Sequence, residues 1–224
     1  MVKVIIIGGK GTAIDIAEQI INAREKFNEG IEFLGWAVDD ESLGPVINGY
    51  PVLCKPRELA EKFTHPEVKF IFSLYKAGRM EERVRLLMSY GIEPSRFANF
   101  IHPLAYVAKS AVLGVGNVIF SYASVFSNVR IGNYNIVYSY SVIGHDTRIG
   151  DNNFVATALI GSEIVIGNGI FIGINSAIRE RVQISDYAFI GMGSTVLRNV
   201  DSHEKVVGIP ATTMSRLPPK KEPV

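Results

Sequence analysis

The first hundred residues alternate between short apolar runs and segments whose apolar positions recur at helical spacing. Apolar runs of this length are typical of buried strands, and apolar positions three and four residues apart are typical of helices packed on one face. In chain order, these strands and helices are expected over 2–7, 12–27, 31–38, 56–63, 69–74 and 79–92. The alternation predicts a small α/β domain with a parallel sheet over residues 1–97.

A different pattern starts at Ile101, where an aliphatic residue recurs at every sixth position. One five-residue step, from Val155 to Ile160, interrupts the series, and the period then resumes. The positions are Ile101, Val107, Leu113, Ile119, Val125, Ile131, Val137, Ile143, Ile149, Val155, Ile160, Ile166, Ile172, Ile178, Ile184, Ile190 and Val196. Neither a helix of 3.6 residues per turn nor a flat strand of period two gives this spacing, so the series indicates an internal repeat.

A period of six is typical of a parallel β-helix, in which three short strands form each triangular coil. We expect the aliphatic residues to point inward and to stack from coil to coil. About six coils would give a prism roughly 29 Å long at the usual spacing between strands. This domain is expected over 98–211, followed by a tail over 212–224. We expect the Gly, Asn or Asp residues that follow the aliphatic positions to form the corners, among them Gly132, Gly144, Gly150, Gly167, Gly173 and Gly191.

The flat faces of such a prism favour association between copies. Tyr122, Tyr138 and Tyr140 are predicted to be exposed on these faces. They would either be buried against identical subunits or take part in ordinary packing, and the sequence leaves both interpretations open.

Composition narrows the choice of partners. The 224 residues include 23 basic and 22 acidic side chains, a net charge of +1, which gives no electrostatic reason to expect nucleic acid or an anionic membrane as a partner. A small anionic ligand stays possible. The single cysteine, Cys54, cannot form an internal disulfide, and the opening apolar run is too short for a signal peptide or a membrane span. We therefore expect a cytoplasmic protein.

The loop of Gly8, Gly9, Lys10, Gly11 and Thr12 opens the first helix in a Rossmann-like βα unit. Free N–H groups at a helix N-terminus favour a phosphate, and glycines allow it to approach closely. The dinucleotide fingerprint is incomplete, because its third glycine would fall on position 14, which is isoleucine. Nicotinamide cofactors are therefore disfavoured.

Two acidic residues, Asp39 and Asp40, follow the second predicted strand. They could hydrogen-bond a ribose or a base while the glycine loop holds phosphate, which favours a nucleotide over free phosphate. The alternative is a tight glycine turn beside a solvated strand end.

Several segments resemble the sialic-acid O-acetyltransferase-like family of sugar acyltransferases, which includes acetyl-CoA-dependent N-acetyltransferases of nucleotide-linked amino sugars. The resemblance rests on "IIIGGKGTAIDIAEQI", "VDD", "FIHPLAYVAKSAVLG", "VIGHDTRIGD", "IVIGNGIFIGINSAI", "FIGMGSTVLRNV" and "VVGIPA". It implies a homotrimer, with the N-terminal domain binding the sugar nucleotide and a left-handed β-helix presenting acetyl-CoA in clefts between subunits.

The same resemblance assigns site residues. The catalytic histidine falls on His145 and the acidic residue beside it on Asp146. The expected acetyl-CoA contacts are Ser162, Gly173, Ile174, Gly191, Met192, Gly193, Arg198, Ile209, Pro210 and Ala211. The expected sugar-nucleotide contacts are Gly8, Gly9, Lys10, Gly11, Thr12, Asp39, Asp40, Ser73 and Tyr138.

The chain departs from the family pattern near the acceptor. Many relatives have histidine at the positions of Thr12 and Phe154, and asparagine at the position of Tyr138. A lysine that is frequent after the G-x-P-A motif is replaced by Thr212. Other basic residues would then have to contact the CoA phosphates, and the candidates are Arg179, Arg181, Arg198, Lys220 and Lys221.

His145 has the properties that acyl transfer requires. It lies two positions after the inward Ile143, so its side chain is expected outside the packed core, where it could accept a proton from an attacking amine. Asp146 could fix the imidazole tautomer. A backbone N–H of the Gly173 or Gly191 turn could stabilise the oxyanion. The alternative is a solvated turn histidine without a catalytic role.

Other mechanisms are disfavoured. A covalent acyl-enzyme would need an activated nucleophile, and Cys54 lies in the other domain without an evident base. A zinc site of the kind found on some β-helices needs about three histidines in register. The chain has four dispersed histidines, so no metal is expected.

The sequence therefore predicts an acyltransferase that moves acetyl from acetyl-CoA to the amine of a nucleotide-linked deoxyamino sugar, in the synthesis of bacterial surface glycans such as lipopolysaccharide. Two alternatives stay open. One is acetylation of a sugar hydroxyl, and the other is a non-catalytic trimeric scaffold that binds a nucleotide but not acetyl-CoA.

Overall fold

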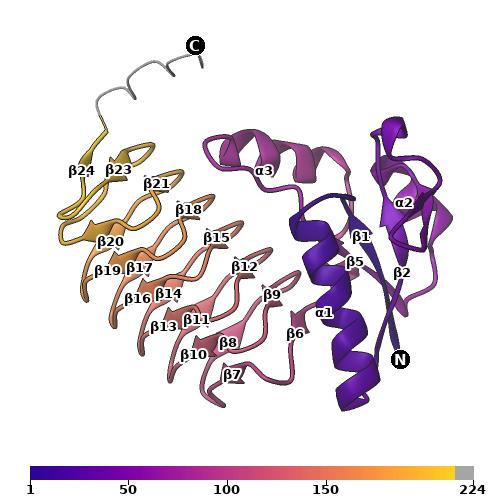
Figure 1. Ribbon diagram of the computed structural model, residues 1–224, viewed down its shortest axis with the longest axis horizontal. Helices are drawn as coiled ribbons and strands as arrows, with labels where there is room; N and C mark the ends of the chain where they lie inside the picture. Colours follow the sequence, from indigo (N-terminus) through magenta and orange to yellow (C-terminus); the bar gives the residue numbers. More distant parts are fainter. Residues whose placement is uncertain (215–224) are drawn as a thin grey trace, which may run out of the picture.

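The computed structural model describes residues 1–214 and shows an N-terminal α/β region beside a β-helix (Figure 1). The N-terminal sheet has the strand order β3-β4-β2-β1-β5. Its strands are parallel, except that β3 and β4 form an antiparallel hairpin that the sequence analysis did not predict. The strands are β1 Val2–Ile7, β2 Ile31–Ala37, β3 Val46–Ile47, β4 Tyr50–Cys54 and β5 Val68–Phe72.

Helices cover both faces of this sheet. The helices are α1 Thr12–Phe27, α2 Leu59–Lys62 and α3 Met80–Ser89, with 3-10 turns at Glu41–Leu43, Pro56–Glu58 and Pro94–Arg96. The apolar stripe of α1, including Ile16 and Ile20, packs in one cluster with Phe120 and Ile136 of the β-helix. Because α1 contacts both the sheet and the β-helix, it fixes the N-terminal region on the coils.

The second half of the chain is a left-handed β-helix made of two-residue strands in three sheets. The first sheet contains β6 Phe100–Ile101, β9 Val118–Ile119, β12 Ile136–Val137, β15 Phe154–Val155, β18 Phe171–Ile172, β21 Phe189–Ile190, β23 Lys205–Val207 and β24 Thr212–Thr213. The second contains β7 Tyr106–Val107, β10 Ser124–Val125, β13 Val142–Ile143, β16 Leu159–Ile160, β19 Ala177–Ile178 and β22 Thr195–Val196. The third contains β8 Val112–Leu113, β11 Arg130–Ile131, β14 Arg148–Ile149, β17 Val165–Ile166 and β20 Gln183–Ile184.

The six-residue period is confirmed, since each aliphatic residue of the series is the second residue of a strand. Nearly all of these residues form one buried core. The first coil differs: Ile101 is 38 % exposed, and Val107 and Leu113 are only partly buried. Below this coil there is no further coil to cover them, which is the physical reason for the difference.

The predicted glycines do lie in the corners between strands, but they do not provide the left-handed backbone of those corners. The left-handed backbone conformation occurs three positions after the inward residue, for example at Tyr134 and Asp146. The predicted glycines lie one position after it, and none of them has positive φ. Their requirement is steric: a Cβ on Gly144 would lie 2.6 Å from the carbonyl carbon of Gly161 in the next coil.

The three tyrosines expected on the outer faces behave differently from one another. Tyr122 and Tyr140 are exposed and their rings stack at 5.3 Å. Tyr138 is only partly exposed and packs against α1, so the prediction of an exposed Tyr138 was wrong. Only the first two are available to a neighbouring copy.

The end of the β-helix is closed by a short hairpin. Thr212 and Thr213 pair antiparallel with β23, so the predicted tail begins with a strand. The rest of that tail, with Lys220 and Lys221, lies outside the described residues. Across residues 1–214, no helix has the length and apolar character that a transmembrane segment needs.

A ladder of buried asparagines stabilises one corner of the coils. Asn117, Asn135 and Asn153 are each at most 1 % exposed. The side-chain oxygen of Asn135 accepts from the backbone and side-chain nitrogens of Asn153, and its own nitrogens donate to Asn117. Within this ladder, each asparagine thus satisfies polar groups of the next one, in a site from which water is excluded.

Asn135→Ala is expected to lower the free energy of unfolding by about 2–4 kcal/mol, because it leaves buried donors and an acceptor without partners. Chemical denaturation measures the change. The exposed Lys109→Ala serves as control, with an expected effect within about 0.5 kcal/mol. A loss in Asn135→Ala no larger than in the control would contradict the role of the ladder.

Candidate active site

The glycine loop lies between the ends of β1, β2 and β5. A Cβ on Gly8 would lie 2.5 Å from Ser73 Oγ, and a Cβ on Gly9 would lie 2.7 Å from Ile47 Cδ1. Gly11, with φ of 52°, precedes the first residue of α1 and carries no side-chain cap. The loop therefore leaves the helix N-terminus open, as a phosphate site requires.

The structure brings several of the predicted nucleotide contacts to this loop. Lys10 forms an exposed ion pair with Asp40 at 2.9 Å. Hydrogen bonds from Ser42 and Lys10 lower the pKa of Asp40. Asp39 is exposed beside it, whereas Ser73 is buried and donates its hydroxyl to Ile7 O at 2.7 Å. Ser73 thus has a structural bond in addition to any ligand contact.

Tyr138 connects the β-helix to the start of α1. Its Oη lies 2.8 Å from Thr12 Oγ1 and 3.0 Å from Asp15 Oδ2. Because a carboxylate only accepts, the phenol donates to Asp15 and can accept from Thr12. Burial and the Asp15 carboxylate raise the pKa of Tyr138 to about 12, so the phenol stays protonated.

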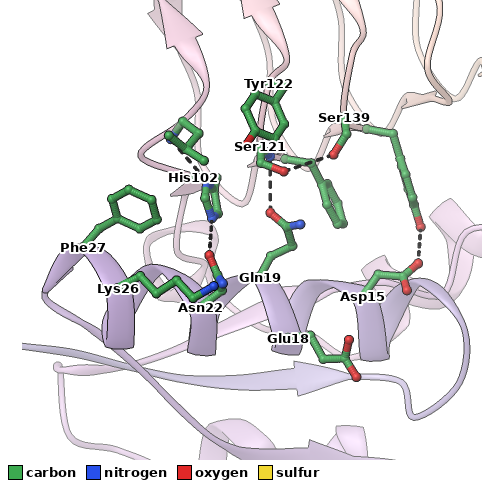
Figure 2. A pocket seen from close by; sticks show the side chains of 13 residues that line it. Asp15, Glu18, Gln19, Asn22, Lys26, Phe27, His102, Ser121, Tyr122 and Ser139 are labelled. Atoms are coloured by element: carbon green, nitrogen blue, oxygen red, sulfur yellow. Dashed lines mark hydrogen bonds between the residues drawn. The ribbon is translucent and has the colours of Figure 1, made fainter.

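A polar cavity of about 650 Å³ lies between α1 and the lower coils, and we name it the α1 cavity (Figure 2). Two further contacts cross it: Ser121 N donates to Gln19 Oε1 at 3.3 Å, and His102 Nε2 lies 3.3 Å from Asn22 Oδ1. Its lining comprises Asp15, Glu18, Gln19, Asn22, Lys26, Phe27, His102, Leu104, Phe120, Ser121, Tyr122, Tyr138 and Ser139.

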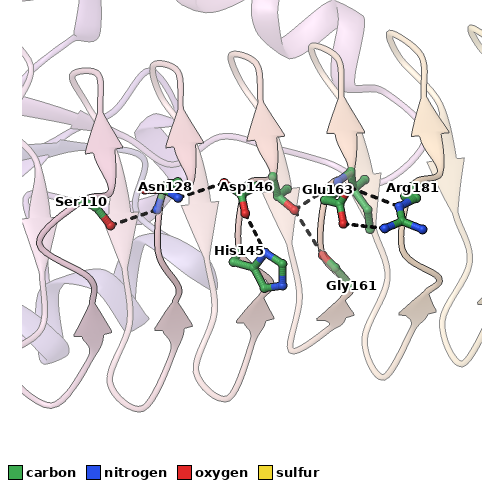
Figure 3. Close-up of polar contacts among 9 residues, drawn as sticks. Ser110, Asn128, His145, Asp146, Gly161, Glu163 and Arg181 are labelled. Atoms are coloured by element: carbon green, nitrogen blue, oxygen red, sulfur yellow. Dashed lines mark hydrogen bonds and ion pairs between the residues drawn. The ribbon is translucent and has the colours of Figure 1, made fainter.

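His145 lies at the corner between the second and third sheets (Figure 3). Its side chain is 53 % exposed, and its Nδ1 is 2.7 Å from Asp146 Oδ2. Asp146 also accepts from Asn128 Nδ2 at 2.9 Å, and the bonds from His145 and Asn128 lower its pKa. With Nδ1–H donated to a fixed carboxylate, Nε2 presents its lone pair outward and can accept a proton.

An apolar groove of about 560 Å³ lies on the outer face of the first sheet, and we refer to it as the groove. Four of the predicted acetyl-CoA contacts line it, namely Gly173, Ile174, Gly191 and Met192. The other lining residues are Ala77, Gly78, Ala156, Phe171, Phe189, Lys205, Val207 and Met214, which the sequence analysis did not identify. Its length and apolar lining suit a flexible amphipathic arm.

The remaining predicted acetyl-CoA contacts lie outside the groove. Ser162 is at the same corner as His145, one coil further along. Gly193, Ile209 and Pro210 lie at the corner after the first sheet, and Ala211 is buried beneath them. The structure does not gather these residues into one cavity.

The turns predicted to hold the oxyanion donor have both used and unused N–H groups. Gly173 N donates to Ile190 O, and Gly191 N donates to Val206 O, both at 2.8 Å. The coil-to-coil ladder thus uses the N–H groups of the two glycines, and a donor in these turns has to be another residue. Among residues 1–214, the following N–H groups, of Ile174 and Met192, have no backbone acceptor.

The basic residues proposed for phosphate contacts also differ in their availability. Arg198 donates to both carboxylate oxygens of Glu204 and thereby holds the pKa of that carboxyl at about 2. Arg181 is paired with Glu163 at 3.0 Å. Lys205, at one end of the groove, has no ion pair within the described chain. Lys205 is thus better placed than Arg181 or Arg198 to contact a CoA phosphate.

The candidate groups occupy three separate regions of one chain: the glycine loop, the corner of His145 and the groove on the first sheet. Tyr138 lies between the first and third of these regions, but His145 belongs to a different corner of the prism. Residues 1–214 contain no group of three or more metal-ligating side chains suited to bind an ion.

No family model matches the chain. Solved structures do match it over nearly their whole lengths. The acetyltransferase domain of PglB from Neisseria gonorrhoeae, in complex with acetyl coenzyme A, is 24 % identical, with 95 % of this chain and 98 % of that chain covered and a TM-score of 0.78. WeeI from Acinetobacter baumannii is 23 % identical, with 96 % and 100 % covered and a TM-score of 0.77.

A further match is a perosamine N-acetyltransferase variant from Caulobacter crescentus, in which asparagine replaces a histidine, in complex with CoA and GDP-perosamine. It is 22 % identical, with 96 % of this chain and 97 % of that chain covered and a TM-score of 0.78. These similarities show that the present chain has the same two-part fold.

Proposed function

We propose that the protein is an acetyl-CoA-dependent N-acetyltransferase that acts on the amine of a nucleotide-linked deoxyamino sugar, in the assembly of bacterial surface glycans. The observation that carries the proposal is the His145–Asp146 pair, whose outward Nε2 is prepared to take a proton. The apolar groove and the open glycine loop supply separate places for donor and acceptor. Structural neighbours described as complexes with CoA or acetyl coenzyme A agree with this assignment.

In the proposed reaction, the acceptor nitrogen attacks the thioester carbonyl carbon and the carbon–sulfur bond then breaks. His145 Nε2 accepts the proton that the amine loses and returns it to the departing sulfur, so no external acid or base is consumed. Asp146 keeps the imidazole in the correct tautomer and stabilises its charged form. The N–H of Ile174 or Met192, in the Gly173 and Gly191 turns, stabilises the oxyanion.

The separation of His145 from the groove supports a homotrimer. If each groove faces the His145 corner of a neighbouring copy, base and thioester meet at the boundary between chains. The exposed and mutually stacked Tyr122 and Tyr140 offer an aromatic surface for contact between copies. We therefore also propose that the N-terminal region over 1–97 binds the nucleotide and the coils over 98–211 bind acetyl-CoA.

A thiol-release assay with acetyl-CoA and a panel of UDP-, GDP- and dTDP-linked amino sugars tests the function. Release with at least one amino sugar is expected. Release only with acceptors that offer hydroxyl groups would instead favour O-acetylation. Calorimetric titration with CoA decides the remaining alternative, because a non-catalytic scaffold would show no binding.

Lys205→Ala is expected to weaken CoA binding about tenfold, the loss typical for one charge-assisted contact to a phosphate. Binding of acetyl-pantetheine, which lacks the nucleotide, should be unchanged. Calorimetry measures both affinities. Arg198→Ala is the comparison variant. A larger loss of CoA affinity in Arg198→Ala than in Lys205→Ala would show that Arg198, and not Lys205, contacts the phosphate.

A further inference from the structure

On the outer face of the first sheet, the residue after each inward aliphatic residue forms a row along the prism. Strand register aligns the members of this row from coil to coil. In order, they are His102, Phe120, Tyr138, Ala156, Gly173, Gly191 and Val207. Side chains are large in the lower coils and small in the upper coils, and the change occurs between Tyr138 and Ala156.

This change in size explains where the groove begins. Ala156, Gly173 and Gly191 form its floor, and the stacked rings of Phe171 and Phe189 form one wall. Tyr138 is the next member of the row beyond Ala156; it lines the α1 cavity and is not itself part of the groove lining. The tyrosine ring thus stands between Ala156, at this end of the groove, and the polar α1 cavity.

The ring of Tyr138 is held in place from several directions. It stacks on Phe120 with centroids 4.5 Å apart and lies 5.2 Å from the ring of Phe154. Its hydroxyl is fixed by Thr12 and Asp15, as described above. A side chain with a stacked face and a bonded hydroxyl cannot swing aside without losing both sets of contacts.

The two ends of the groove differ in chemistry, which orients the donor. Lys205 at one end suits the phosphates, while Tyr138, one coil beyond Ala156 at the other end, is bonded to Thr12, the first residue of α1. From Val207 to Tyr138 the row covers four coil steps, or roughly 19 Å at the usual spacing between strands, which is comparable with an extended pantetheine arm. The thioester then lies at the Tyr138 end, beside the acceptor.

From this arrangement we infer that Tyr138 closes the acyl end of the groove and restricts the donor to short acyl groups. The inference rests on the proposed function, and it assigns to Tyr138 a role in donor selection that is separate from any contact with the sugar. A longer acyl chain would have to occupy the volume of the ring. A fixed wall of this kind commonly discriminates by about 10–200-fold for one methylene.

The test compares acetyl-CoA, propanoyl-CoA and butanoyl-CoA as donors for the wild type, Tyr138→Ala and Tyr138→Phe. In the wild type, kcat/KM should fall at least tenfold from acetyl-CoA to butanoyl-CoA. Tyr138→Ala should reduce this ratio to less than about threefold, because the chain gains the space of the ring. Tyr138→Phe keeps the ring and removes only the hydroxyl bonds, so its ratio should follow the wild type.

Calorimetric binding of the same three acyl-CoA compounds keeps the test independent of turnover. The binding measurement remains valid if Tyr138→Ala loses activity because its contact with the sugar acceptor is weakened. The exposed Tyr106→Ala, on the second sheet, controls for the loss of a tyrosine from the β-helix. Tyr138→Leu provides a smaller apolar wall if the alanine variant does not fold, and it should give an intermediate ratio.

The possible failures are distinguishable. Wild-type protein that binds no CoA would overturn the proposed function together with this inference. Wild-type protein that binds and transfers acetyl, with the same chain-length ratio in Tyr138→Ala, would overturn the inference alone. If the ratio of acetyl-CoA to butanoyl-CoA activity falls as much in Tyr138→Phe as in Tyr138→Ala, the effect comes from the hydroxyl bonds and not from the ring. That result would also contradict the inference.

Discussion

His145→Ala is expected to lower kcat by about 10²–10⁴-fold, the usual contribution of a positioned general base. The side chain lies outside the packed core and is half exposed, so its removal should leave the fold intact. CoA affinity should change little, because His145 does not line the groove of its own chain and would meet only the thioester end of a neighbouring one. Steady-state kinetics and calorimetry on the same preparation separate the two effects.

Two companion variants make this prediction stricter. Asp146→Asn keeps a partner for Nδ1 but removes the carboxylate, so its loss should be smaller than that of His145→Ala. His145→Asn should allow residual transfer to an amine but none to a hydroxyl, since a hydroxyl depends more strongly on the base. Full activity in His145→Ala would leave His145 as a solvated corner residue.

Most of the β-helix could be predicted from the sequence because one physical requirement repeats. Each inward position needs an aliphatic side chain, so the six-residue period was visible without any structure. Even after the five-residue step, Ile160 is the second residue of a strand, because the corner before it is one residue shorter. The exposure of Ile101 could not be predicted from the period, because it depends on what lies below the first coil.

The roles of the glycines could not be read from the same period. Composition alone does not distinguish a glycine needed for left-handed backbone from one needed for close approach, and in this chain the six predicted corner glycines are of the second kind. The same proximity of coils commits the N–H groups of Gly173 and Gly191 to the ladder. Both features depend on the coil above each turn, which the sequence of a single turn does not show.

Other features carried a signal that was not used. The β3–β4 hairpin turns at Asn48 and Gly49, and an Asn-Gly pair between apolar residues is a strong local sign of a hairpin. The floor of the groove becomes visible when the sequence is written with one coil per line and the inward residues Val155 and Ile172 in one column. Ala156 and Gly173 then stand in the next column. The contacts of Tyr138 with Thr12 and Asp15 join segments more than 120 residues apart and carry no local signal.

Ala156→Trp is expected to weaken CoA binding at least about 100-fold, because a large ring would fill the apolar groove that the arm requires. The side chain of Ala156 points outward into this space and is partly exposed, so the new ring does not enter the packed core. Calorimetry with CoA measures the effect. The unchanged glycine loop should still bind the nucleotide of the acceptor, which serves as the internal control.

Combining Ala156→Trp with His145→Ala in mixed oligomers tests whether a site is shared between chains. Each variant alone should be nearly inactive. If every site takes its groove from one copy and its histidine from the next, equal random mixing leaves about one quarter of the sites with both parts intact. Co-expression with two affinity tags, followed by kinetics on doubly purified protein, should therefore recover measurable activity. Mixed oligomers as inactive as their parents would show that groove and histidine act within one chain, and the arrangement proposed for the trimer would be wrong.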